Sequence, residues 1–236
     1  MVSSKKLNIV LDIGKTNVKL TFVDSINNKT IKFFKTKQKN IYRHGIKILN
    51  SNSIFEWAIK KITYIERKHD LDKFVCTAHG TSIALISYDD KELLACTDYE
   101  YKFDKLINSY KKIAPKFNES FSPFLENGLN IGQQIYYLYK KKQQLIKETK
   151  YILNYPQYIV WKLTSSFSSE ISYVGCHTHL WDFKRNKLSS FVKKIKLEKK
   201  FPKIRKAWDT IGQREIGGSN LKIINGIHDS NASYLY

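Results

Sequence analysis

The strongest constraint in this sequence is a set of three strand-like runs near its beginning, joined by turns too short to hold a helix. Residues 7–11 (LNIVL) form an apolar run that is typical of a buried strand. Residues 18–23 (VKLTFV) alternate between apolar and polar side chains, and residues 29–37 (KTIKFFKTK) follow a polar turn. Because tight turns connect antiparallel neighbours, the chain is predicted to begin with an antiparallel meander.

The rest of the chain combines helical and strand patterns. Ser53, with Glu56 three residues later, matches a capping box that begins a helix. Further strands are predicted at residues 74–78, 82–87 and 221–224, and further helices at residues 131–147 and 155–163. The predicted order is three strands, a helix and another strand, followed by further helices and strands. This order indicates a mixed α/β domain.

The composition excludes several classes of protein. Of 236 residues, 42% are hydrophobic, too many for a disordered chain, and 10 Gly, 4 Pro and 3 Cys exclude collagen-like and disulfide-framework proteins. Cys76, Cys96 and Cys176 form no CxxC pair, which disfavours a zinc ribbon or a redox motif and predicts reduced thiols. The longest stretch without Asp, Glu, Lys or Arg, residues 74–88, is shorter than the ~18 residues of a membrane span. We therefore expect a cytoplasmic protein with no membrane partner.

The net charge of +20 invites a nucleic-acid interpretation, but the kind of basic residue argues against it. Of the 41 Lys and Arg residues only five are Arg, the residue that bonds guanine and phosphate bidentately. Lys is spread along the chain beside abundant Asn and Ile, the residues that an AT-rich coding sequence supplies. A solvated lysine surface is favoured over a specific nucleic-acid site.

Residues 11–19 (LDIGKTNVK) place a carboxylate and a polar turn at the end of the first strand. The candidate residues are Asp12, Gly14, Lys15, Thr16 and Asn17. Gly14 lets a phosphate approach backbone N–H groups, the polar side chains can donate to phosphate oxygens, and Asp12 could hold Mg²⁺ through water. This is not a P-loop, since GxxxxGK[ST] is absent. A plain polar hairpin explains the segment equally well.

Residues 225–234 (NGIHDSNASY) place Asp229 after a strand and a glycine, where a helix is predicted to begin. A carboxylate there could accept the proton of a substrate hydroxyl during phosphoryl transfer, with His228 and Ser230 as flanking hydrogen-bond partners. Asp is also an ordinary N-cap residue, and taken alone this segment favours capping.

A third polar segment, residues 175–182 (GCHTHLWD), holds His177 and His179 two positions apart. No second cluster of Cys or His accompanies them, so a metal site is disfavoured. Trp181 is expected in the core or against a small ligand. His79 and Gly80 end the strand at residues 74–78, at a position open to a ligand or to a simple surface turn.

Together these segments resemble the N-terminal domain of the FGGY carbohydrate kinases, within the rhamnulokinase-like and fuculokinase-like branch. The matching segments, in the family's order, are LDIGKTNVKL (11–20), AHGTSIALI (78–86), YPQYIVWKLT (155–164), SEISYVGCHTHLWDF (169–183), FPKIRKAWDTIG (201–212) and NGIHDSNAS (225–233). Each is weak alone, but the ordered set spans nearly the whole chain.

The resemblance implies a ribonuclease H-like fold of the actin, sugar kinase and Hsp70-type ATPase class, with a mixed sheet flanked by helices. It implies ATP-dependent phosphorylation of a hydroxyl of a ketose or related monosaccharide, with Mg²⁺. Asp229 matches the catalytic base, and Asp12 matches the carboxylate near the metal. The remaining matches are Gly14, Lys15, Thr16 and Asn17 in the phosphate-facing hairpin, and His79, Gly80, His228 and Ser230 at sugar contacts.

Two residues and the length depart from the family pattern. Ser165 stands where relatives usually carry Gly, and His179 where they carry Asp. Family members are about twice as long, and their C-terminal domain holds adenosine. We therefore expect residues 1–236 to form one N-terminal, sugar-binding domain, with the nucleotide-binding domain absent from this chain and little catalysis by the chain alone. A non-catalytic sugar-binding or regulatory module, or a truncated relic of a kinase, stays open as the alternative. A nucleic-acid-binding ribonuclease H-like protein is disfavoured, because only Asp12 and Asp229 are obvious metal-binding carboxylates.

Overall fold

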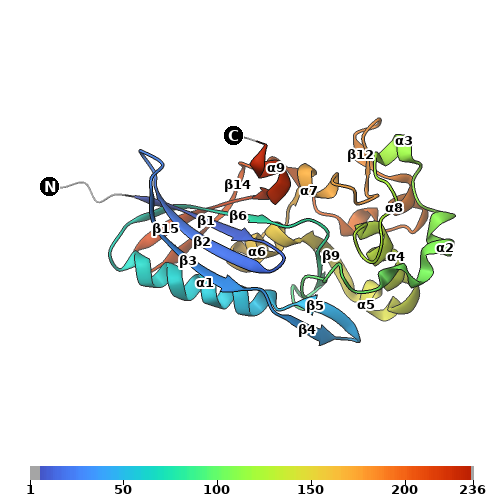
Figure 1. The fold of residues 1–236 in the computed structure, drawn as a ribbon, viewed down its shortest axis with the longest axis horizontal. Helices are drawn as coiled ribbons and strands as arrows, with labels where there is room; N and C mark the ends of the chain where they lie inside the picture. Colours follow the sequence, from blue (N-terminus) through green and yellow to red (C-terminus); the bar gives the residue numbers. More distant parts are fainter. Residues whose placement is uncertain (1–5, 235–236) are drawn as a thin grey trace.

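The computed structural model describes residues 6–234, and its main feature is a seven-stranded mixed sheet (Figure 1). Its strands are β1 (Leu7–Ile13), β2 (Asn17–Asp24), β3 (Thr30–Lys37), β6 (Leu71–Ala78), β14 (Thr210–Ile216), β15 (Ser219–Ile224) and β16 (Ile227–His228). The spatial order is β14-β15-β6-β1-β2-β3, and β16 pairs with β6 after the chain leaves β15. The predicted antiparallel meander β1-β2-β3 and the mixed α/β architecture are confirmed.

Alternating side chains give the sheet one buried face and one open face. Along β1, Leu7, Ile9, Leu11 and Ile13 are fully buried, while the residues between them point to the other side. On that other side Val10 and its neighbours are only partly buried. Two further apolar residues on the edge strand β3, Ile31 (41% exposed) and Phe33 (48% exposed), extend this open face.

Two helices, α1 (Ser51–Glu66) and α6 (Tyr155–Thr164), cover the buried face of the sheet. The prediction that Ser53 caps α1 is wrong. Asn50 is the N-cap, and its side-chain oxygen accepts a hydrogen bond from the backbone N–H of Ser53. The α6 helix ends as the family resemblance leads one to expect, since Ser165 adopts a left-handed φ of 58°, a conformation that glycine adopts with least strain.

A second region, built mostly from residues 79–200, lies beyond the end of the main sheet (Figure 1). Its helices are α2 (Ile107–Lys111), α3 (Phe117–Ser120), α4 (Ile131–Lys141), α5 (Gln143–Glu148), α7 (Ile171–Val174) and α8 (Ser190–Lys194), and two 3-10 helices span Phe103–Leu106 and Glu198–Lys200. The small sheets of the chain pair β4 (Asn40–Arg43) with β5 (Ile46–Leu49), β7 (Ile83–Ser87) with β8 (Glu92–Leu94) and β9 (Thr149–Asn154), β10 (Ser169–Glu170) with β13 (Ile204–Arg205), and β11 (Trp181–Asp182) with β12 (Lys187–Leu188).

The single helix predicted over residues 131–147 is wrong, because the chain breaks at Lys142 between α4 and α5. Lys142 has φ −136° and ψ 50°, outside the helical region. Trp181 is 8% exposed, which confirms its predicted place in the core. No helix within residues 6–234 combines the length and the apolar character that a membrane span requires.

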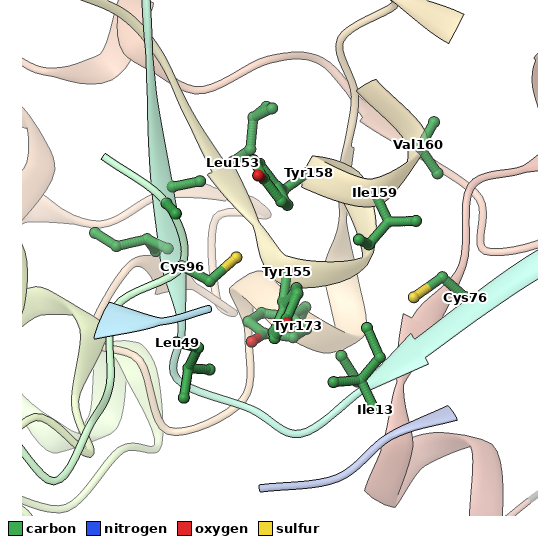
Figure 2. Packing of buried hydrophobic residues seen from close by; sticks show 14 of the residues in the cluster. Ile13, Leu49, Cys76, Cys96, Leu153, Tyr155, Tyr158, Ile159, Val160 and Tyr173 are labelled. Atoms are coloured by element: carbon green, nitrogen blue, oxygen red, sulfur yellow. The ribbon is translucent and has the colours of Figure 1, made fainter. Parts of the chain in front are cut away.

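The hydrophobic core that the two regions share contains several tyrosines (Figure 2). Tyr155, Tyr158 and Tyr173 are fully buried. The hydroxyl of Tyr173 donates to the backbone carbonyl of His79 at 2.7 Å and accepts from the backbone N–H of Ser82 at 3.1 Å. These bonds anchor the loop that follows β6, at the carboxyl end of the sheet.

Candidate active site

Three parallel strands end side by side at one edge of the sheet. Ile13 of β1 and His228 of β16 both pair with Ala78, the last residue of β6. The segments that follow these strands are therefore brought together, although the sequence separates them by more than 200 residues in all. The carboxyl edge of parallel strands is the usual place for a ligand in α/β proteins.

A cleft of about 490 Å³ opens at this edge. Its walls come from residues 79–81, Tyr99, residues 176–177 and residues 228–231. Five predicted site residues therefore line one cavity: His79, Gly80, His228, Asp229 and Ser230. The predicted phosphate hairpin, residues 14–17, does not line the cleft but follows β1 at the same edge.

Asp229 is the first residue of helix α9 (Asp229–Ser233), and its side chain is 34% exposed. Its Oδ1 accepts a hydrogen bond from the backbone N–H of Ser230 at 2.6 Å and lies 3.3 Å from the Ser230 hydroxyl. His228, not Asp229, occupies the N-cap position. The capping role that the sequence alone favours for Asp229 is therefore wrong.

Asp12 and Asp229 are electrostatically coupled. Partial burial raises the pKa of Asp12, the negative charge of Asp229 raises it further, and Lys19 lowers it. Within residues 6–234 the Asp12 carboxylate makes no hydrogen bond or ion pair with protein groups, so its oxygens are free for a ligand. An accessible carboxylate with few acidic neighbours suits Mg²⁺, which binds proteins largely through its own water molecules.

His228 packs directly on Gly80. A Cβ at position 80 would lie 2.7 Å from His228 Nε2, so a side chain there would require the imidazole to shift. His228 Nδ1 lies 2.8 Å from the amide oxygen of Asn231, and Nε2 lies 3.3 Å from Asp229 Oδ1. His228 thus packs against the backbone of Gly80 and places Nε2 beside the carboxylate of Asp229.

His79 lines the cleft and carries a buried ring nitrogen without a partner among residues 6–234. Its Nδ1 lies 2.9 Å from the carbonyl oxygen of Gly80, which can only accept, so Nδ1 carries the proton. Burial, and to a lesser degree the charge of Lys15, lowers the pKa of His79. The neutral ring therefore leaves Nε2 as an acceptor, and that atom is buried without a partner among residues 6–234. A ligand hydroxyl that donates to Nε2 would satisfy it.

The hairpin between β1 and β2 is tight and presents polar groups to solvent. The Gly14 N–H donates to the carbonyl of Asn17 at 2.9 Å, and a Cβ on Gly14 would come equally close to that oxygen. Thr16 and Asn17 are exposed. Lys15 differs from its neighbours, because its ammonium group is paired with Asp98 and lies 3.5 Å from Glu100.

Comparison with known proteins gives matches among solved structures only. No family model matches the sequence, and no curated protein matches it. A carbohydrate kinase from Novosphingobium aromaticivorans is 27% identical, with a TM-score of 0.91 over 98% of this chain and 50% of that one. The fold is that of one half of an FGGY-type carbohydrate kinase.

More distant kinases share this fold. A ligand-bound xylulose kinase from Lactobacillus acidophilus is 17% identical, with a TM-score of 0.81 over 98% of this chain and 49% of that one. A glycerol kinase from Plasmodium falciparum, solved with ADP, is 13% identical, with a TM-score of 0.78 over 97% and 50%. The chain thus spans about half the length of the structures it matches. Its placement in the rhamnulokinase-like and fuculokinase-like branch stays a prediction.

The kinase fold separates the two histidines of the GCHTHLWD segment. His177 lines the cleft beside Cys176, with Nδ1 3.0 Å from the sulfur. His179 is buried elsewhere, bonded to the Tyr110 hydroxyl and to the Ser122 carbonyl, each at 3.0 Å. They do not face a common ligand, and residues 6–234 hold no group of three or more His, Cys, Asp or Glu side chains suited to a metal ion.

Sequence reasoning missed several residues of the cleft. Tyr99 forms part of its wall, and Asn231 holds the ring of His228. Cys176 also lines the cleft; burial and then the charge of Asp229 raise the pKa of its thiol to about 11, which keeps the thiol neutral. Asn231 follows Asp229 closely and could have been found from the NGIHDSNASY segment, but no local pattern marks Tyr99.

Proposed function

We propose that this chain is the sugar-binding half of an ATP-dependent carbohydrate kinase, with Asp229 as its general base. The observation that carries the proposal is the cleft itself. A partly exposed carboxylate, a ring nitrogen of His228 and the unpartnered Nε2 of His79 converge at the carboxyl edge of the sheet. Such groups recognise a polyhydroxylated ligand by accepting and donating hydrogen bonds.

In the proposed reaction Asp229 accepts the proton of one sugar hydroxyl. The oxygen of that hydroxyl attacks the γ-phosphorus of ATP, the bond to the β,γ-bridging oxygen breaks, and ADP leaves. His228, 3.3 Å from the carboxylate, orients Asp229 toward the hydroxyl. His79 accepts a second hydroxyl at Nε2 and so sets how the sugar lies in the cleft.

The hairpin completes the phosphate side of the proposed site. Gly14, Thr16 and Asn17 lie at the end of β1 with an exposed hydroxyl and amide available to phosphate oxygens. Asp12 would hold Mg²⁺ through water, and the ion would neutralise phosphate charge. This assigns Asp12, rather than Asp229, to the metal, since the proton acceptor must face the sugar.

We assign the nucleotide pocket to a second half, since this chain spans about half the length of the kinases that it matches. Phosphoryl transfer depends on positioning and charge stabilisation from both sides of a closed cleft. Residues 1–236 alone are therefore expected to bind sugar but to catalyse little or no transfer.

The open face of the sheet, with Ile31 and Phe33 exposed, offers apolar surface for association. The free cysteines fit a cytoplasmic location.

The deciding experiment uses the protein at the length at which its source cells make it, established by intact-protein mass spectrometry. That protein is incubated with ATP, Mg²⁺ and a panel of ketoses and other monosaccharides, and phosphorylated sugar is detected by mass. The proposal predicts an ATP-dependent product for at least one sugar. It also predicts loss of product in Asp229→Asn but not in the matched control Asp209→Asn, which removes a partly exposed carboxylate that pairs with Arg205 outside the cleft.

The alternative, a non-catalytic sugar-binding module, shares the same cleft. It predicts saturable sugar binding with no phosphorylated product under any condition of the panel. Asp229→Asn would then change sugar affinity by a few-fold at most and abolish nothing. Turnover retained in full by Asp229→Asn would contradict the assignment of Asp229 as base.

A further inference from the structure

Lys15 departs from the role that its position in the hairpin suggests. Its side chain is 19% exposed, and its ammonium group pairs with Asp98, 83 residues away. It also lies 3.5 Å from Glu100 Oε2 and 4.8 Å from the centre of the Tyr99 ring. The lysine therefore turns away from the phosphate side of the hairpin and contacts three consecutive residues, of which Tyr99 lines the cleft.

Asp98 is a rigid anchor for this lysine. Its side chain is fully buried, its Oδ2 lies 2.9 Å from Lys47 Nζ, and its Oδ1 accepts from the backbone N–H of Glu100 at 3.0 Å. Burial alone would raise the pKa of Asp98, but the bonds from Lys15, Glu100 and Lys47 outweigh it and lower the pKa. Two lysines and two carboxylates thus neutralise one another, which leaves no unpaired positive charge here for a phosphate.

The residue that Lys15 covers belongs to the sugar side of the site. Tyr99 lines the cleft, and its ring meets that of His79 edge-on, with 5.6 Å between centroids. The backbone carbonyl of Tyr99 accepts from Gly128 N–H at 2.8 Å, which holds the main chain but not the ring. The Tyr99 hydroxyl makes no hydrogen bond within residues 6–234. The ring is held by the cation above it and by His79.

We propose that Lys15 is a positioning residue of the sugar cleft, which holds the Tyr99 ring in the wall beside His79 and so sets sugar affinity without contacting the sugar. This inference rests on the proposed sugar-binding function. It reassigns Lys15 from the phosphate side to the sugar side and leaves phosphate contacts to Gly14, Thr16 and Asn17. It also makes Tyr99 a determinant of which monosaccharide fits.

The test measures sugar affinity by calorimetry on residues 1–236, with the best-binding monosaccharide from a panel. Lys15→Met removes the charge and keeps the stem, and we expect it to weaken binding by about three- to thirtyfold, the range of a cation–π contact joined to an ion pair. Lys15→Arg keeps both interactions and should stay within about twofold of the unaltered chain. Lys35→Met is the matched control, since Lys35 lies over Phe33 on β3, away from the cleft.

A double-mutant cycle separates positioning from a general loss of structure. Tyr99→Leu should weaken binding, and adding Lys15→Met should weaken it no further, because the lysine acts through the ring. Tyr99→Phe keeps the ring, so Lys15→Met should still weaken sugar binding in that background. This pair of variants replaces the leucine pair if Tyr99→Leu fails to fold. His228→Gln lies on another wall, and its effect should add to that of Lys15→Met.

Three outcomes are distinguishable. If the unaltered chain binds no sugar, the proposed function fails and takes this inference with it. If the chain binds sugar and Lys15→Met stays within about twofold, or its effect adds to that of Tyr99→Leu, the inference alone is overturned. If Lys15→Met leaves sugar affinity intact but weakens binding of inorganic phosphate, Lys15 is a phosphate ligand after all.

Discussion

The imidazole of His228 rests on Gly80 so closely that a Cβ at position 80 would come within 2.7 Å of Nε2. This relationship joins the loop after β6 to the start of α9, two segments about 150 residues apart. It also explains why the residue at position 80, which lines the cleft, is a glycine. A single methyl group at position 80 would require the ring of His228 to shift from this place.

We therefore expect Gly80→Ala to weaken sugar binding by tenfold or more, with a small loss of stability. The displaced His228 can no longer keep Nε2 within 3.3 Å of Asp229. Calorimetry with the best-binding sugar measures the effect, and thermal unfolding monitors the fold. Gly218→Ala is the matched control, because its Cβ would meet nothing closer than Glu66 Oε1 at 3.7 Å. Equal affinities for the two variants would show that His228 has no part in binding.

Removing the charge of Asp229 should shift the titration of Asp12. The negative charge of Asp229 raises the pKa of Asp12, so Asp229→Asn should lower that pKa toward its ordinary value of 3.8. Carboxyl-carbon NMR titration of Asp12 measures the change in the 236-residue chain, without substrate. Asp209→Asn should leave the titration unmoved. If the titration curve of Asp12 is identical in the unaltered chain and in Asp229→Asn, the two carboxylates do not interact and do not share a site.

In the catalytically complete protein the same Asp229→Asn substitution should lower kcat by about 10²–10⁴-fold, the usual contribution of a general base, with sugar affinity changed by a few-fold at most. An amide of the same shape can still hydrogen-bond the hydroxyl but cannot take its proton. Initial rates at saturating sugar and ATP measure the effect. A lower affinity with unchanged kcat would make Asp229 a binding residue instead.

Tyr173→Phe should destabilise the fold by about 1–3 kcal/mol, the cost of leaving buried backbone groups unpaired. The lost hydroxyl serves the His79 carbonyl and the Ser82 N–H at once. Urea unfolding measures the change, and Tyr64→Phe on the exposed side of α1 is the control. Because the loop carries His79, sugar affinity should fall as well. Stability equal to that of the control would show that solvent replaces both bonds.

Acid should destabilise the chain at pH values below about 6.5 through its buried and half-buried histidines. Burial lowers the pKa of His79, His177 and His179 below the ordinary 6.5, so each is held neutral in the folded state. Their contribution is complete above pH 6.5 and is lost as the pH falls through the folded-state values, because the unfolded chain binds more protons there. Urea midpoints across this range should fall as the pH falls. A flat profile would contradict the burial of neutral rings.

The sequence predicted those parts of the fold that depend on local pattern. The meander follows from alternation and tight turns, and His79 directly follows β6, whose apolar run is plain. Asp229 follows β16, a two-residue strand that no local pattern marks. Local pattern does not decide where α1 begins, because Asn50 and Ser53 are both good caps and only the backbone of Asn50 leaves the helical region. The break at Lys142 has no local sign, since the residues around it favour a helix.

The sequence predicted the site residues that lie near the ends of strands, but not cleft residues such as Tyr99. Asp12, His79 and Asp229 each follow or end a strand, so a motif and a register place them. The pairing of Lys15 with Asp98 joins segments 83 residues apart through a loop without a pattern, and only the packed structure places Tyr99 beneath the lysine. The hairpin motif alone therefore assigned Lys15 to phosphate.

The most direct test of a sugar site is a calorimetric panel of monosaccharides against residues 1–236, run in parallel with Gly80→Ala. We expect at least one monosaccharide to bind one-to-one and saturably, and the substitution to abolish or strongly weaken this binding while the chain stays folded. No binding by any sugar to the folded chain, or binding that is unchanged in Gly80→Ala, would contradict a sugar site at the carboxyl ends of β1, β6 and β16.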